Sequence, residues 1–180
     1  MIKKKSEFVN KFLQSVILLF GAVWLGSQIT KVLTIYYFFQ TDRFGRIALK
    51  NEILPNILNS ISYQLVPIFS VSLISYVLFI LFVIFYFFLV RKNLKKMGWI
   101  FISFVIIIFC LPFEIYLSFI DIELLKDLFY RTGESASILL LFEKRILALS
   151  SFPIISIILH SIIFFLIVFK PLDKRELIEN

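Results

Sequence analysis

The sequence predicts an all-α integral membrane protein, built as a bundle of four transmembrane helices. Hydrophobic residues make up 60% of its 180 residues, whereas soluble domains contain about 45–50%. Four apolar stretches reach the length of about 20 residues that crosses roughly 30 Å of hydrocarbon. The connections between them are too short for a folded soluble domain, so residues 1–180 are predicted to form one membrane domain. The predicted spans cover about 12–39, 64–90, 98–120 and 149–169.

The first span, 12–39, contains a signal for close helix packing. In the stretch GAVWLGSQ, Ala22 and Gly26 form a small-xxx-small pair at which another helix can approach. A cleaved secretory signal is an alternative interpretation of this region, with MIKKK as its basic segment. The apolar character continues well past Gly26 and no A-x-A-like cleavage site follows, which favours a membrane span.

Proline and aromatic residues mark the later spans. Pro67 and Pro153 fall near the starts of the second and fourth spans, where a first-turn proline removes no needed donor. Pro112 instead lies inside the third span and is predicted to kink it. Trp99, at the start of the third span, suits the aromatic belt at a membrane interface.

The two longer connections combine apolar and charged residues at helical spacing. IALKNEILPNIL (47–58) and IELLKDLFYR (122–131) are predicted to form short amphipathic helices on the outer membrane face. Gly133 is predicted to end the second of these helices, and 138–147 is predicted to extend the fourth span outward as helix. Both connections could equally serve as docking surfaces for another subunit.

The basic residues predict the orientation of the chain. The segment RKNLKK (91–96) has four basic residues and no acid, and both terminal segments are also basic. The positive-inside rule therefore places the N- and C-termini in the cytoplasm, and a prokaryotic cytoplasmic (inner) membrane is the predicted location. The net charge of +7 is assigned to anionic lipid headgroups rather than to nucleic acid. The residues expected to contact these lipids are Arg91, Lys92, Lys95 and Lys96.

Four polar residues inside the predicted spans form a candidate intramembrane site. Glu114 and Gln28 both lie about 24 Å from the inner ends of their spans, and Lys31 lies about 28 Å from the inner end of its own. This matching depth predicts an ion pair between Glu114 and Lys31, with Gln28 hydrogen-bonding nearby. His160, about 15 Å below the outer start of its span, is expected to join them only through a longer contact or a water.

These residues also have structural interpretations. Lys31 can extend to the outer interface, and Glu114 can bond a backbone carbonyl that Pro112 leaves free. His160 can connect two helices through a hydrogen bond. Ionisable residues at membrane depth nevertheless favour a functional site. The aspartates are all placed in predicted loops or in the C-terminal tail: Asp42, Asp121, Asp127 and Asp173.

Motifs that would assign an enzyme are absent from the sequence. A single histidine cannot supply a bis-His haem, and a lone cysteine, Cys110, excludes an internal disulfide. No P-loop, G-x-S-x-G or G-x-G-x-x-G motif occurs. No cofactor, metal or catalytic set is therefore predicted.

Two functions are favoured over an enzyme on these observations. The first is a non-catalytic subunit, assembly factor or scaffold of a larger membrane complex, with other membrane subunits or further copies of the chain as partners. The second is a small-molecule or ion transporter, a channel or a quinone-interacting protein that uses the polar site around Glu114. Four spans are few for an alternating-access monomer, so the second function would require an oligomer.

Overall fold

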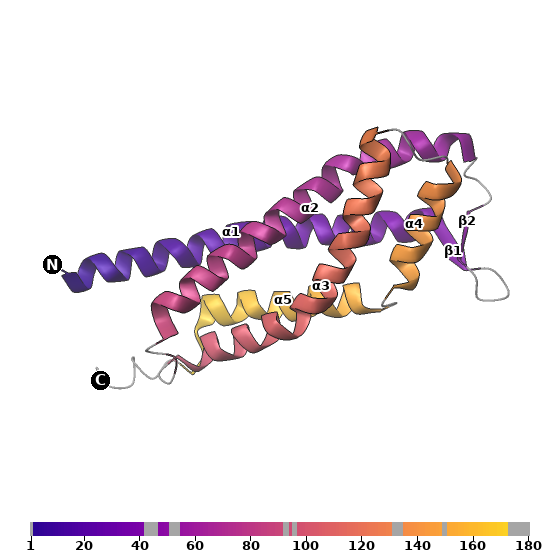
Figure 1. Cartoon of the computed structure of the whole chain (residues 1–180). Helices are drawn as coiled ribbons and strands as arrows, with labels where there is room; N and C mark the ends of the chain where they lie inside the picture. Colours follow the sequence, from indigo (N-terminus) through magenta and orange to yellow (C-terminus); the bar gives the residue numbers. More distant parts are fainter. Residues whose placement is uncertain are drawn as a thin grey trace.

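The structure, a computed structural model, describes residues 2–41, 47–50, 55–91, 94, 97–130, 135–148 and 151–172. The start of α1 and the end of α5 lie at one end of an elongated bundle, here called the terminal end (Figure 1). The strands and α4 lie at the opposite end, here called the α4 end. The elements are α1 (Ile2–Phe38), β1 (Phe39–Thr41), β2 (Ile47–Leu49), α2 (Pro55–Val90), α3 (Gly98–Tyr130), α4 (Ser135–Leu147) and α5 (Phe152–Phe169).

Four of these helices are long and apolar enough to cross a membrane, judged by length and composition. This finding confirms the predicted all-helical architecture with four candidate spans. At a rise of 1.5 Å per residue, α1, α2 and α3 each measure about 50 Å or more, compared with a hydrocarbon thickness of about 30 Å. The helices are therefore long enough to continue beyond the hydrocarbon. The candidate spans are Phe8–Phe38, Tyr63–Val90, Gly98–Tyr130 and Phe152–Phe169.

The third helix is longer than the sequence analysis predicted. A separate amphipathic helix at 122–131 is not found, because α3 continues without a break to Tyr130. Leu124 and Leu128 extend the buried face that Leu117 already occupies, so the apolar repeat that suggested a new helix belongs to the same one. Arg131 and the predicted stop at Gly133 lie outside the described residues.

A short hairpin replaces part of the other predicted amphipathic helix. Ile47–Leu49 is strand β2, which pairs antiparallel with β1 so that Phe39 lies opposite Leu49 and Thr41 opposite Ile47. The backbone N–H of Lys50 donates to the Phe38 carbonyl oxygen at 3.1 Å, which closes the hairpin against the end of α1. Residues 55–58 of the predicted segment are the first turn of α2.

The course of α3 is bent. Figure 1 shows that α3 follows α5 along its first part and then turns toward the α4 end. Pro112 lies within the helix, near the middle of its sequence. Proline removes one helical hydrogen bond and crowds the preceding turn, so the predicted kink accounts for this bend.

The predicted outward extension of the fourth span is a separate helix. The predicted helical extension at 138–147 forms the separate helix α4, and α5 begins at Phe152 rather than at the predicted residue 149. Ser151 is the N-cap residue of α5 and Pro153 lies in its first turn, a position that proline tolerates. The separation of the two helices allows α4 to pack against the outer part of α3 while α5 packs against its first part (Figure 1).

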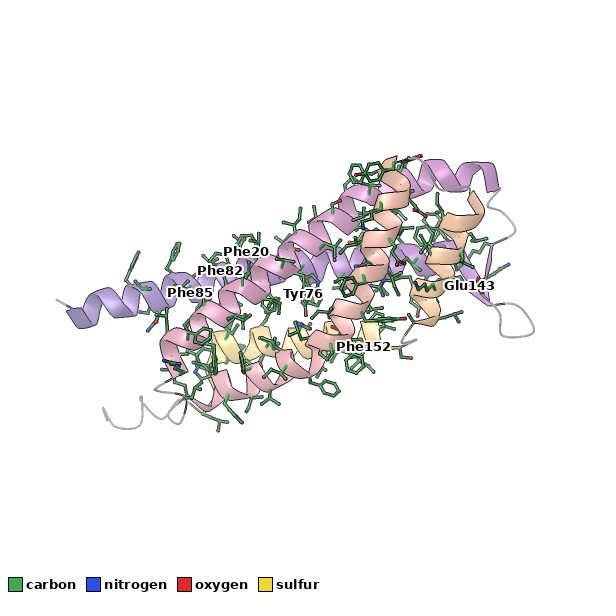
Figure 2. All side chains as sticks on the ribbon, viewed as in Figure 1. Phe20, Tyr76, Phe82, Phe85, Glu143 and Phe152 are labelled. Atoms are coloured by element: carbon green, nitrogen blue, oxygen red, sulfur yellow. The ribbon has the colours of Figure 1, made fainter. Side chains whose placement is uncertain are left out.

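Two of the three apolar clusters fill the two halves of the bundle. Trp24, Phe79 and Ile163 belong to the cluster toward the terminal end, and Phe69, Leu128 and Phe142 belong to the cluster toward the α4 end. Aromatic contacts join the helices, as where Phe20 of α1 stacks on Phe82 of α2 with ring centroids 5.6 Å apart (Figure 2). Between the two clusters, every long helix contributes buried polar residues, and these form the candidate site.

Candidate functional site: a buried polar network

Three charged residues form an ion cluster, defined as Lys31, Asp121 and Arg145. Lys31 Nζ donates to Asp121 Oδ2 at 2.7 Å, and Arg145 Nε donates to Asp121 Oδ1 at 2.7 Å. The residues come from α1, α3 and α4, and each is no more than 4% exposed. Lys31 Nζ also donates to Ser72 Oγ on α2, at 3.2 Å. Both carboxylate oxygens are therefore engaged, and the ion cluster together with Ser72 joins four helices.

The ion cluster has more positive than negative charge. Asp121 offsets only one of the two cations, and the acid closest along the buried face of α3 is Glu114, two turns earlier. Seven residues correspond to about 10 Å along a helix, so Glu114 lies deeper in the bundle, toward the terminal end. Electrostatic interactions connect Glu114 with both Lys31 and Arg145. Glu114 is therefore a second buried acid whose electrostatic field reaches the ion cluster, while Asp121 is the only acid in direct contact with Lys31 and Arg145 among the described residues.

A second group, the imidazole cluster, is defined as Glu114, Ser156 and His160. Ser156 Oγ donates to Glu114 Oε1 at 2.5 Å. His160 Nδ1 lies 2.9 Å from the backbone carbonyl oxygen of Ser156 and 3.3 Å from its Oγ. Ser156 and His160 are four residues apart on α5, which places them on one helix face. The imidazole cluster thus joins α3 to α5.

Ser72 connects the ion cluster to Gln28. While accepting a hydrogen bond from Lys31, Ser72 Oγ donates to Gln28 Oε1 at 3.4 Å. Gln28 is fully buried on α1, one turn from Trp24. The Trp24 ring lies 4.4 Å from the His160 ring, centroid to centroid. Gln28 therefore lies between the two clusters.

The four residues that the sequence singled out are all buried in this region, but the predicted ion pair is wrong. Lys31 pairs with Asp121 instead of Glu114. The sequence analysis ended the third span at residue 120 and placed Asp121 in a loop. Asp121 was therefore not considered as a partner for Lys31. His160 reaches Glu114 through Ser156, a direct side-chain bridge rather than a long contact or a water.

Several residues of the network were missed by the sequence analysis. Asp121 follows Glu114 by seven residues, which is two helical turns, and this spacing could have indicated a shared face. Ser156 precedes His160 by four residues and could have been found in the same way. Arg145 carried no comparable signal, because its burial depends on how α4 folds back onto α3.

The predicted packing pair, Ala22 and Gly26, lies on an exposed face of α1 in the part of the chain that the structure describes. Both residues are exposed, and a Cβ added to Gly26 would have no atom within 4 Å beyond its chain neighbours and the backbone of its own helix. The close helix approach occurs instead at Gly21, where an added Cβ would lie 2.7 Å from a Phe164 ring carbon and 3.1 Å from Phe79. Ala22 and Gly26 therefore belong to the outward face of α1.

Within the described part of the chain, no group of three or more His, Cys, Asp or Glu residues could hold a metal ion. The comparisons with protein-family models, curated proteins and solved structures gave no match. The class of protein therefore rests on the fold itself. Four helices of spanning length and composition, with a polar network enclosed among them, indicate a multi-pass integral membrane protein.

Proposed function

We propose that this chain is a non-catalytic subunit or scaffold of a larger membrane complex. The observation that supports it is the ion cluster, in which Lys31, Asp121 and Arg145 are engaged with one another and join the helices. Buried ion pairs can fix one helix arrangement among several of similar apolar packing. A bundle held in one arrangement presents a constant outer surface, which is what a scaffold requires.

The outward face of α1 is the proposed contact with a neighbouring subunit. Ala22 and Gly26 lie on this face, flanked by the exposed Leu19 and Leu33. Small residues allow two helix backbones to approach closely in a membrane. Since this pair is exposed among the described residues, a helix of another subunit or of a second copy is its proposed partner.

The proposed setting is a prokaryotic cytoplasmic membrane, with the terminal end facing the cytoplasm. The basic segment 91–96 supports this orientation through the positive-inside rule. Arg91 is exposed at the end of α2, and Lys170 lies at the end of α5. Lys92, Lys95 and Lys96, the other residues expected on anionic lipids, lie outside the described residues.

Native mass spectrometry of the tagged chain, extracted gently from its own membranes, tests the proposal. A second polypeptide at fixed ratio is the expected result, and its loss is expected in the double variant Ala22→Leu/Gly26→Leu. The matched control is Val105→Leu/Ile108→Leu, which changes an exposed apolar face of α3. Detection of the chain only as a monomer would contradict the proposal. The same fraction of complex in both double variants would also contradict it.

A second candidate function is transport of a small molecule or ion through the region around Glu114. The observation that favours it is the incomplete hydrogen bonding of the polar side chains beside Glu114, because structural polar networks are normally satisfied. A flux assay in proteoliposomes distinguishes it, with Glu114→Gln expected to abolish flux. Glu123→Gln, an exposed change on the same helix, is the control and should leave flux unchanged.

A further inference from the structure

Three buried polar atoms beside the imidazole cluster have no hydrogen-bond partner among the described residues. They are Gln28 Nε2, Tyr76 OH and His160 Nε2. Their residues come from α1, α2 and α5 and are 0%, 6% and 1% exposed. Leaving one buried donor or acceptor unsatisfied costs about 1–3 kcal/mol. Three such atoms in one region point to a bound group that satisfies them together.

Ring contacts connect Tyr76 and His160 through Trp24, and helix spacing places Gln28 next to Trp24. The Tyr76 and His160 rings are 6.3 Å apart between centroids, and both lie against Trp24, at 5.1 and 4.4 Å. Gln28 follows Trp24 by one helical turn, so its side chain is on the same face of α1. Figure 2 shows Tyr76 in the space between α2 and α5. The fourth buried atom without a partner, Trp99 Nε1, belongs to a residue at the start of α3, near the terminal end.

The tautomer of His160 follows from its contacts. The Ser156 carbonyl oxygen can only accept a hydrogen bond, so Nδ1, 2.9 Å away, must be the protonated nitrogen. In a neutral imidazole the other nitrogen is then an acceptor. His160 Nε2 therefore presents a lone pair, whereas the Gln28 amide and the Tyr76 hydroxyl present donors.

We propose that Gln28, Tyr76 and His160 bind one buried water molecule, through which His160 Nε2 accepts a proton. The water accepts from the Gln28 amide and the Tyr76 hydroxyl and donates to Nε2, which gives it the two to four polar partners that a buried water requires. When the bound water has taken up a proton from the solvent, one O–H bond of the resulting hydronium ion breaks, a new N–H bond forms at Nε2 and a neutral water remains. This site does not depend on whether the chain is a subunit or a transporter.

Glu114 is the counter-charge for the imidazolium that forms. Its carboxylate accepts from Ser156 Oγ, which lies 3.3 Å from His160 Nδ1. The hydrogen bonds form a chain from His160 to Glu114, because Nδ1–H can donate to the Ser156 oxygens and Ser156 Oγ–H donates to Glu114. The titratable and charged groups facing this region from the packed helices are Lys31 of α1, Tyr76 of α2, Cys110, Glu114 and Asp121 of α3, and Arg145 of α4.

Nuclear magnetic resonance of the ¹⁵N-histidine-labelled full chain in lipid nanodiscs tests this site directly. The chain contains one histidine, so with a purification tag free of histidine every signal belongs to His160. The expected neutral form is protonated at Nδ1, with a magnetisation-transfer contact between Nε2 and water protons. A neutral form protonated at Nε2, or the absence of that water contact, would overturn the proposal.

Acidification supplies the second readout. In Glu114→Gln, we expect the imidazolium signal of His160 to appear only at a proton concentration at least tenfold higher than in the unchanged chain. The control variant Glu123→Gln is expected to titrate like the unchanged chain. An unchanged titration in Glu114→Gln would refute the counter-charge. If that variant does not fold, Tyr76→Phe removes a single oxygen and should weaken the water contact at Nε2. An undiminished contact in Tyr76→Phe would refute the water site.

Discussion

The ion cluster and the imidazole cluster lie side by side in one bundle and differ in how completely they are bonded. Asp121 uses both carboxylate oxygens on cations, and none of the buried polar atoms that lack a partner in the described part of the chain belongs to the ion cluster. Around His160, three polar atoms have no partner among the described residues. The difference indicates that the ion cluster fixes helix positions, whereas the polar atoms around His160 are available to hydrogen-bond a bound molecule.

The largest expected effect tests the structural role of the ion cluster. Asp121→Asn leaves Lys31 and Arg145 buried without a counter-charge, which should lower the free energy of unfolding by about 3–5 kcal/mol. Denaturation of the protein in mixed micelles measures this change. Glu123→Gln is the control, because its partner Lys144 is about half exposed and such pairs contribute about 0–1 kcal/mol.

A compensated variant sharpens the same test. Lys31→Met, Asp121→Leu and Arg145→Met together remove all three charges and leave apolar side chains of related size. Such replacements are often neutral or stabilising, so the triple variant should be more stable than Asp121→Asn alone. If the triple variant is as unstable as Asp121→Asn, unbalanced charge is not the cause of the lost stability.

The next effect concerns the link between α3 and α5. Ser156→Ala removes the donor to Glu114 and should lower the free energy of unfolding by about 1–3 kcal/mol. Ser161→Ala is the matched control, because the exposed Ser161 hydroxyl only donates to a carbonyl of its own helix. Equal stability of the two variants would mean that the Glu114–Ser156 contact contributes nothing.

Helix packing beside the imidazole cluster gives an effect of similar or smaller size. Gly21→Ala places a methyl group 2.7 Å from Phe164 and should destabilise the bundle by about 1–3 kcal/mol through overpacking. Gly26→Ala adds its methyl group in open space and should be neutral or slightly stabilising. A thermal unfolding comparison of the two variants that finds no difference would contradict the packing assigned to Gly21.

The smallest expected effect shows whether a water molecule is bound among Gln28, Tyr76 and His160. If a water satisfies the Tyr76 hydroxyl, Tyr76→Phe removes a formed hydrogen bond and should cost about 1 kcal/mol. If nothing satisfies that hydroxyl, the same change should be neutral or stabilising, because a buried unpaired group disappears. Denaturation in mixed micelles, as for Asp121→Asn, distinguishes the two outcomes.

Much of the fold was accessible from local information. Apolar runs of spanning length predicted four helices, and Pro112 predicted the bend in α3. The prediction was wrong where a local pattern had two meanings. The spacing of Leu124 and Leu128 suits a surface helix as well as the continuation of a buried one, and only contact with α4 decides between them.

The sequence by itself determined that polar residues such as Glu114, Lys31 and His160 lie among apolar helices. Hydropathy is averaged over residues that are adjacent in the sequence, so it identifies polar residues within apolar stretches without a structure. Which polar residues meet was decided only by the tertiary structure. The partner of Lys31 depends on the rotation and length of α3, and the burial of Arg145 depends on the fold of α4. These quantities arise from packing between segments distant in sequence, and residue spacing within one helix does not contain them.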